Sequence, residues 1–213
     1  MIIKVCGMRE PENIRDLMAL KGVDWMGLIF YPKSSRFVEE VSADSKTYRG
    51  FEIEKVGVFV NATEKEILDK ADLYGLQKIQ LHGEESPEFI KNLRDKASFE
   101  IIKVFRVGEG WNWKQTEAFL SLVDWFLLDT AGSGYGGTGK KFDWEVLERY
   151  PFDKPFLLSG GIDEDSVEAL VDLYRKLPPL KGVDINSKFE HKPGVKNMEM
   201  IARFVTKLRK ATE

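Results

Sequence analysis

Short apolar segments recur along the chain, and each is followed by a segment typical of a helix. Segments such as VGVFV and PFLL are continuously apolar rather than alternating. This is expected of strands that are covered by helices on one face and turned inward on the other. In the first unit, a strand at residues 2–5 ends at Cys6, and Pro11 opens a helix with Glu12 in its first turn. The basic unit is therefore a strand, a loop and a helix.

This unit occurs eight times. The predicted strands cover residues 2–5, 25–30, 55–60, 76–81, 100–105, 125–128, 155–158 and 180–185, and the predicted helices cover residues 11–20, 43–48, 64–71, 87–94, 113–121, 143–149, 164–175 and 197–209. Eight such units favour an α/β fold of one domain, a single (β/α)₈ TIM barrel over residues 1–213. The alternative is an open doubly wound sheet, which has six strands and usually a G-x-G-x-x-G turn after the first. The loop CGMREPEN does not match that turn.

Composition and charge bear on whether the chain binds nucleic acid or a membrane. The chain has 213 residues, 43% hydrophobic and 31% charged, with a formal net charge of -3, as is typical of a soluble globular protein. This charge gives no basis for nucleic-acid binding, and no apolar run approaches the roughly 20 residues of a membrane span. The first residues lack the apolar core of a signal peptide. We therefore expect a cytoplasmic protein with no nucleic-acid or membrane partner. We also expect no fused second enzyme, and an assembly that is either a monomer or a homodimer, which the sequence does not distinguish.

The stretch FLLDTAGSGYGGTGKKFDW joins a buried strand, a carboxylate and a glycine-rich loop. Asp129 stands where the strand ends, and five glycines occur in the next ten residues. Such a segment is too flexible and too small to pack a core. We expect the loop at residues 131–141, which includes Tyr135 and Lys140, to become ordered over a bound ligand.

In a (β/α)₈ barrel, the carboxyl ends of the strands and the loops after them form the active face. Reading those positions gives nine candidate site residues: Cys6, Arg36, His82, Asp129, Gly160, Gly161, Asp184, Asn186 and Ser187. One cysteine and two histidines cannot form a spaced zinc motif, so we expect no metal.

Two glycine- or serine-containing turns follow the last two predicted strands. In LSGGID, Gly160 and Gly161 leave the backbone N–H groups of a helix start open to a phosphate, and GVDINS offers a second turn of this kind. Each turn alone would more often be structural. The pair after strands seven and eight matches the phosphate site common in these barrels and indicates a phosphosugar ligand.

Cys6 and Asp129 are the candidate proton acceptor and donor. Because side chains alternate along a strand, Lys4 and Cys6 should face the barrel interior, with Cys6 at the rim. A nearby lysine ammonium favours the thiolate, the form that accepts a proton, and Asp129 should face it across the mouth. Such a pair suits an isomerisation that moves hydrogen between adjacent carbons. The alternatives are an inert, packed cysteine and an aspartate that caps a turn.

The chain resembles the phosphoribosylanthranilate isomerase family of tryptophan biosynthesis in the segments KVCG, FYPKSSR, VGVFVN, IQLHGEE, LLDT with YGGTGKKFDW, LSGGI, and GVDINSKFE with PGVKN. These segments span residues 4–197 in the family's order. The resemblance implies a barrel that needs no cofactor. It also implies an Amadori rearrangement of N-(5-phosphoribosyl)anthranilate, an aminoaldose phosphate, to 1-(2-carboxyphenylamino)-1-deoxyribulose 5-phosphate.

The resemblance further implies a role for each matching residue. Cys6 is the general base, Asp129 is the general acid, and Arg36 contacts the anthranilate carboxylate. His82 and Asp184 are substrate-binding candidates from their positions at strand ends. The turns that hold phosphate contain Gly160, Gly161, Asn186 and Ser187.

Two segments depart from the family's pattern. After the eighth strand the chain reads Asn186, Ser187, Lys188, Phe189 where the family often has two serines and a glycine, and Asn197 stands where aspartate is common. Because phosphate contacts are expected mainly from backbone N–H groups, the first change should alter little. Asn197 is expected to cap the last helix.

Other functions compete with this interpretation. A histidine-pathway isomerase would be expected to have aspartate in place of Cys6, and indoleglycerol-phosphate synthase a site centred on lysine. A non-catalytic phosphate-binding barrel would keep LSGGI and GVDINS but would have no need of Cys6 and Asp129 together.

Overall fold

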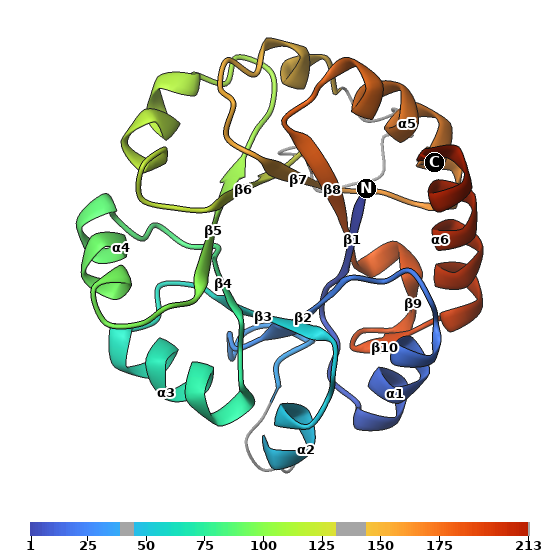
Figure 1. The fold of residues 1–213 in the computed structure, drawn as a ribbon, viewed down its shortest axis with the longest axis horizontal. Coiled ribbons are helices and arrows are strands. Elements are labelled where there is room, and N and C mark those ends of the chain that lie inside the picture. The colour runs from blue at the N-terminus through green and yellow to red at the C-terminus, as the bar shows by residue number, and fades with distance from the viewer. Residues whose placement is uncertain (39–44, 131–143, 213) are drawn as a thin grey trace.

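The computed structural model describes residues 1–38, 45–130 and 144–212. Eight parallel strands close into a barrel in sequence order, with the last strand paired to the first. They are Ile2–Val5 (β1), Trp25–Ile29 (β2), Glu54–Phe59 (β3), Lys78–Leu81 (β4), Glu100–Arg106 (β5), Trp125–Asp129 (β6), Phe156–Ser159 (β7) and Leu180–Ile185 (β8). Figure 1 shows the strands as an inner ring with the helices outside it. The predicted (β/α)₈ barrel is confirmed, and the open sheet is ruled out.

Helices of two kinds pack around the ring. The α-helices are Pro11–Ala19 (α1), Ser45–Arg49 (α2), Glu64–Tyr74 (α3), Pro87–Arg94 (α4), Val167–Lys176 (α5) and Met198–Thr212 (α6), and the 3₁₀ segments are Trp113–Phe119 (η1), Trp144–Arg149 (η2), Glu164–Ser166 (η3) and Ser187–Phe189 (η4). Most bounds lie within a few residues of those predicted.

The predicted α-helices after β5 and β6 are wrong in type, because η1 and η2 are 3₁₀ segments. In η1, the Asn112 side chain accepts a hydrogen bond from the Lys114 N–H at 3.1 Å, and the Thr116 hydroxyl donates to the Trp113 carbonyl at 2.7 Å. Such local side-chain bonds compete with α-helical hydrogen bonding. Segments of this length are also where the tighter 3₁₀ form occurs.

The predicted alternation of side chains along β1 is confirmed. Ile3 and Val5 belong to the main core, which lies between the strands and the helices, whereas Lys4 is fully buried on the other side and pairs with Asp184. A second, smaller core fills the barrel interior and consists of Trp25, Val56, Ile102, Val104, Leu127 and Leu157. Because this core fills the ring, a ligand cannot pass through the barrel.

The end of the barrel where the strands begin is closed by aromatic and charged side chains. The Trp25 and Trp125 rings meet edge to face, with centroids 5.3 Å apart. The buried Lys78 ammonium lies 4.5 Å from the Trp25 ring centroid and 3.1 Å from a carboxylate oxygen of Glu54 and of Glu100. The candidate site residues lie at the opposite end, where the strands finish.

A short hairpin between β8 and α6 was not predicted. Its strands, Glu190–Lys192 (β9) and Val195–Lys196 (β10), pair antiparallel beside α1 (Figure 1). Asn13 of α1 exchanges two hydrogen bonds with the Lys196 backbone, at 3.1 and 2.7 Å. The hairpin is therefore fastened to the rim of the barrel.

Among the residues that the structure describes, no helix is long and apolar enough to cross a membrane.

Candidate active site

A pocket of about 230 Å³ lies at the carboxyl ends of the strands. It is lined by Cys6, Ile29, Val58, Gln80, His82, Leu127, Asp129, Ser159, Gly160, Gly161, Ile162, Asp184, Asn186, Ser187 and Lys188. All nine candidate residues except Arg36 are in this set. Residues scattered over the sequence therefore converge on one cavity, as the barrel topology requires.

The floor of the pocket holds a buried charged cluster around Cys6. Lys4 and Asp184 are register partners on β1 and β8, and the Lys4 ammonium lies 2.9 Å from Asp184 Oδ2. Burial raises the pKa of the Cys6 thiol and outweighs the lowering by Lys4 and Lys196. Lys4 favours the thiolate, as expected, but burial has the larger effect and favours the thiol. Burial lowers the pKa of Lys4, but its charged neighbours, Asp184 first among them, outweigh burial, and the pKa of Lys4 is raised.

Space for the Cys6 sulfur comes from a glycine on the neighbouring strand. A Cβ atom added to Gly27 of β2 would lie 2.8 Å from Cys6 Sγ and 3.1 Å from Cys6 Cα. Both distances are shorter than ordinary carbon contacts. The glycine in the segment WMGLI therefore lets Cys6 occupy the interior rim of the barrel.

His82 and Asp129 face each other at the opposite side of the mouth. His82 Nε2 lies 4.0 Å from Asp129 Oδ2, which is too far for a direct hydrogen bond. Burial lowers the pKa of His82, and this outweighs the raising effect of Asp129; Arg106 lowers it further. His82 is accordingly a neutral imidazole at neutral pH, able to donate one hydrogen bond and accept another.

The predicted phosphate turn lies at the rim. Gly160 and Gly161 have φ of 102° and 61°, in the left-handed region that favours glycine, and both line the pocket. Just beyond them, the Asp163 side chain accepts from the Asp165 N–H at 3.1 Å and caps the helix start. This leaves two backbone units without side chains at the pocket edge, the arrangement that suits an anion.

Arg36 differs from the other candidates because it does not line the pocket. Its guanidinium forms a bidentate pair with Glu190, with Nε 2.9 Å from Oε1 and Nη2 2.6 Å from Oε2. Lys196 donates to the same carboxylate at 2.7 Å and to Asn186 Oδ1 at 2.6 Å. Fork-to-fork pairs of this kind hold both planes in a fixed orientation. The pair thus fixes the position of Arg36 beside the site.

Asn197 directly precedes α6, and its side chain accepts a hydrogen bond from the Met200 N–H at 3.1 Å. The predicted helix cap is confirmed.

Several functional groups were missed from the sequence. Gln80 lines the pocket, Gly27 makes room for the thiol, and Glu190 and Lys196 position Arg36. Of these residues, only Gln80 could have been predicted from the sequence. Polar residues occupy every second position of β4, which indicates that they share the interior face of the strand. The other three depend on contacts between distant segments.

Buried polar atoms in the pocket lack partners. Among the described residues, no hydrogen-bond partner is present for Gln80 Oε1, His82 Nε2 or Asp184 Oδ1, although each atom is buried. A buried polar atom without a partner costs about 1–3 kcal/mol. Three such atoms around one cavity indicate a polar ligand.

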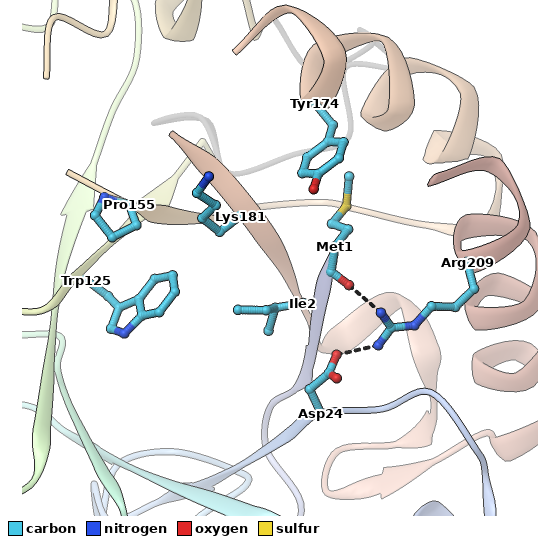
Figure 2. A pocket seen from close by; sticks show the side chains of 8 residues that line it. All are labelled: Met1, Ile2, Asp24, Trp125, Pro155, Tyr174, Lys181 and Arg209. Carbon is cyan, nitrogen blue, oxygen red and sulfur yellow. Dashed lines mark hydrogen bonds and ion pairs between the residues drawn. The ribbon is translucent and has the colours of Figure 1, made fainter. Parts of the chain in front are cut away.

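A larger hollow, of about 450 Å³, lies at the other end of the barrel (Figure 2). The Arg209 guanidinium there is already engaged by the Asp24 carboxylate and by the Met1 and Gly22 carbonyls. The hollow contains none of the candidate residues. Its size therefore does not make it the site of chemistry.

Two further predictions concern metals and the glycine-rich loop. Within the described parts of the chain, no group of three or more His, Cys, Asp or Glu side chains could hold a metal ion. The loop at residues 131–141, with Tyr135 and Lys140, lies outside the described residues.

Comparison with known proteins agrees with this site. Residues 3–207 match the family model described as N-(5'phosphoribosyl)anthranilate (PRA) isomerase. An N-(5'-phosphoribosyl)anthranilate isomerase of Parabacteroides distasonis is 43% identical over 210 residues, covering 98% of this chain and 93% of the relative. That of Phocaeicola vulgatus is 43% identical over 209 residues, covering 98% of each chain.

Solved structures are similar over the same length. The phosphoribosyl anthranilate isomerase of Thermotoga maritima aligns with a TM-score of 0.82 at 30% identity, covering 99% of this chain and 100% of the other. Another isomerase, solved with reduced 1-(o-carboxyphenylamino)-1-deoxyribulose 5-phosphate, aligns with a TM-score of 0.78 at 27% identity, covering 99% and 100%. From its barrel, its site and these matches, the chain belongs to the N-(5'-phosphoribosyl)anthranilate isomerase family.

Proposed function

We propose that this chain catalyses the Amadori rearrangement of N-(5'-phosphoribosyl)anthranilate in tryptophan biosynthesis, with Cys6 as general base and Asp129 as general acid. The observation that carries the proposal is one pocket lined by both residues and, at its rim, by the Gly160–Gly161 turn. A proton acceptor, a proton donor and a phosphate turn are what an aldose–ketose isomerisation of a phosphosugar needs.

The reaction moves one hydrogen and gains no atom. Asp129 protonates the furanose ring oxygen, the C1′–O bond breaks, and the nitrogen lone pair forms an iminium. The Cys6 thiolate then removes the C2′ proton, and the bonding electrons form the C1′–C2′ double bond of an enolamine. The C2′ hydroxyl loses its proton and C1′ gains one, which gives the aminoketose. No cofactor is needed in this sequence.

The remaining side chains bind and orient the substrate. The turns with Gly160, Gly161, Asn186 and Ser187 hold the phosphate, and Lys188 lines the pocket beside them. His82 and Asp184 contact the sugar and its amine. Arg36 binds the anthranilate carboxylate with the guanidinium edge that Glu190 leaves open. Guanidinium suits this role because it is planar and permanently charged.

Substrate fluorescence tests the proposal. Purified protein mixed with N-(5'-phosphoribosyl)anthranilate should speed the decay of substrate fluorescence.

Two variants test the catalytic roles in the same assay. Cys6→Ser should lose most of kcat, on the order of 10² or more, because a serine hydroxyl is a far weaker acid than a thiol. Asp129→Asn should abolish ring opening while product affinity stays within a few fold, since the amide cannot donate a carboxyl proton. Wild-type protein that leaves the decay rate unchanged would favour a non-catalytic phosphate-binding barrel.

Location and assembly are also proposed. We expect the enzyme to act in the cytoplasm as a monomer or homodimer, and one solved relative, from Thermotoga maritima, is a dimeric isomerase from which monomers were generated. Light scattering coupled to size-exclusion chromatography would give the molar mass in solution. A mass near 24.4 kDa would indicate a monomer.

A further inference from the structure

The side chain of Gln80 lies in the wall of the active-site pocket and has no role in the mechanism above. Gln80 is in β4, between Lys78 and His82 on the interior face, and is only 2% exposed. A buried amide is normally hydrogen-bonded at both ends. Gln80 therefore needs a partner.

The barrel does not provide a donor for its oxygen. The register partners of Gln80 are Val58 on β3 and Ile102 on β5, both apolar and buried. Among the described residues, none donates a hydrogen bond to Gln80 Oε1. The missing donor must come from what occupies the pocket.

A second buried acceptor in the same pocket, Asp184 Oδ1, also lacks a donor among the described residues. Asp184 Oδ2 accepts from Lys4, but Asp184 Oδ1 is buried without a donor among the described residues. Gln80 and Asp184 come from β4 and β8, four strands apart around the barrel. The pocket therefore presents an unsatisfied acceptor on each side.

The chemistry of the two acceptors limits the matching ligand group. A phosphate dianion and a carboxylate offer no hydrogen to an acceptor, whereas a hydroxyl donates one hydrogen bond and can also accept one from the amide N–H₂. The substrate's phosphate and anthranilate carboxylate are thus excluded as partners of Gln80 Oε1. The remaining donors are the amine N–H and the ribose hydroxyls, and of these only a hydroxyl is also a good acceptor for the Gln80 N–H₂.

We propose that Gln80 is a substrate-binding residue that accepts a hydrogen bond from a ribose hydroxyl, on the side of the pocket opposite Asp184. This inference rests on the proposed function, since it takes the phosphoribosyl compound as the ligand. It adds a specificity element, because a buried group built to pair with a hydroxyl rejects ligands that lack it.

Gln80→Met tests the proposal, because methionine is similar in length but has no acceptor oxygen. The ligand is reduced 1-(o-carboxyphenylamino)-1-deoxyribulose 5-phosphate, the compound bound by one solved relative. The variant should bind it about 10- to 100-fold more weakly in calorimetry. Its melting temperature should equal or exceed that of the wild type, since an unpaired buried acceptor is removed. Gln80→Glu, which keeps an oxygen at that position, should recover part of the affinity.

Gln115 of η1 is exposed, so Gln115→Met is the matched control and should change neither the affinity nor the melting temperature. A Gln80→Met variant that melts lower than wild type and binds the compound equally well would overturn the proposal and make Gln80 a packing residue. If wild-type protein itself fails to bind the compound, the proposed function fails first. The two failures are therefore distinguishable.

Discussion

At the scale of single residues, Cys6 is subject to opposing electrostatic effects. Its burial raises the pKa of the thiol, whereas the ammonium groups of Lys4 and Lys196 lower it by a smaller amount. A general base acts in its deprotonated form, so the Cys6 proton must be lost before the C2′ proton can be taken. The reaction rate therefore depends on this ionisation.

The ionisation of Cys6 itself should show this raised pKa. The thiolate fraction should keep rising past the ordinary pKa of a thiol, about 8.5. The ultraviolet absorbance of the thiolate, taken as the difference between wild type and Cys6→Ser at each pH, measures that fraction. A difference that has already reached its plateau at neutral pH would contradict a raised pKa. The pH profile of kcat/KM depends in addition on Asp129, because the mechanism needs Asp129 protonated while Cys6 is deprotonated.

Arg36 is a second case in which a single side chain has a testable role. Its proposed contact with the substrate carboxylate exists in both ground and transition states, so its loss should appear mainly in KM. Arg36→Met should raise KM by about 10- to 100-fold with kcat changed much less. Arg36→Lys should recover only part of the lost substrate affinity, because the lysine ammonium is a point charge and cannot form the bidentate contact of a guanidinium.

The exposed Lys33 on the same loop provides the control. Lys33→Met removes one positive charge without touching the pair with Glu190, and its KM should stay near the wild-type value. Equal KM values for Arg36→Met and wild type would place the carboxylate elsewhere.

At the scale of elements, the contact between β1 and β2 determines where the thiol can be. Gly27 lies on the interior face of β2, and its missing side chain leaves the space that Cys6 occupies. An added Cβ would lie 2.8 Å from Cys6 Sγ and also only 3.1 Å from Cys6 Cα, so rotation of the Cys6 side chain alone does not relieve the contact. A side chain at position 27 would therefore displace Cys6 from its present place.

Gly27→Ala should accordingly shift Cys6 and reduce both stability and activity. Overpacking of this kind costs about 1–3 kcal/mol, measurable by urea unfolding. We expect kcat to fall at least 10-fold, because small misplacements of a reacting group are costly. Gly108→Ala is the control, since nothing lies within 4 Å of an added Cβ there. Wild-type kcat in Gly27→Ala would show that Cys6 does not need its present position.

At the scale of the whole molecule, one carboxylate joins segments that are far apart in the sequence. Glu190 of the β9–β10 hairpin binds Arg36 from the loop after β2 and Lys196 from β10. In the ring, β8 and β2 flank β1, so this cluster spans the first strand at the carboxyl end of the barrel. The cluster should therefore contribute to the stability of the closed barrel.

The pH dependence of unfolding should report this contribution. Burial raises the pKa of Glu190, but hydrogen bonds from Arg36 and Lys196 outweigh it, and the net pKa is lowered. A lowered folded-state pKa stabilises the protein above the ordinary glutamate pKa, and this stabilisation is lost as the pH falls through the lowered value.

Glu190→Gln should thus destabilise the protein by about 3 kcal/mol near neutral pH, because two cations lose their counter-charge. The difference from wild type should shrink as the pH falls below the ordinary glutamate pKa, because wild-type Glu190 then becomes protonated through its lowered pKa. Urea unfolding at several pH values measures the loss of stability near neutral pH and its change with pH. The exposed pair of Lys65 and Asp69 offers a control, and Asp69→Asn should alter stability little at any pH.

The sequence alone determined the order and number of the strands, because each is a short apolar segment that must be buried whatever its neighbours are. It also indicated which side chains share one face of the barrel. In a parallel barrel all strands end at the same face, so Cys6, His82 and Asp129 could be assigned to one mouth from their strand positions alone. Their convergence on one pocket confirms that reasoning.

Only the tertiary structure decided the features that depend on distances between segments remote in sequence. Three features are of this kind: the balance of burial against Lys4 and Lys196 that raises the pKa of Cys6, the space left by Gly27, and the pairing of Arg36 with Glu190. The 3₁₀ form of η1 and the β9–β10 hairpin also escaped prediction, since local side-chain bonds and packing override weak propensities over so few residues. Sequence periodicity carries the direction of a side chain, whereas its pKa and its partners depend on atoms that only folding brings together.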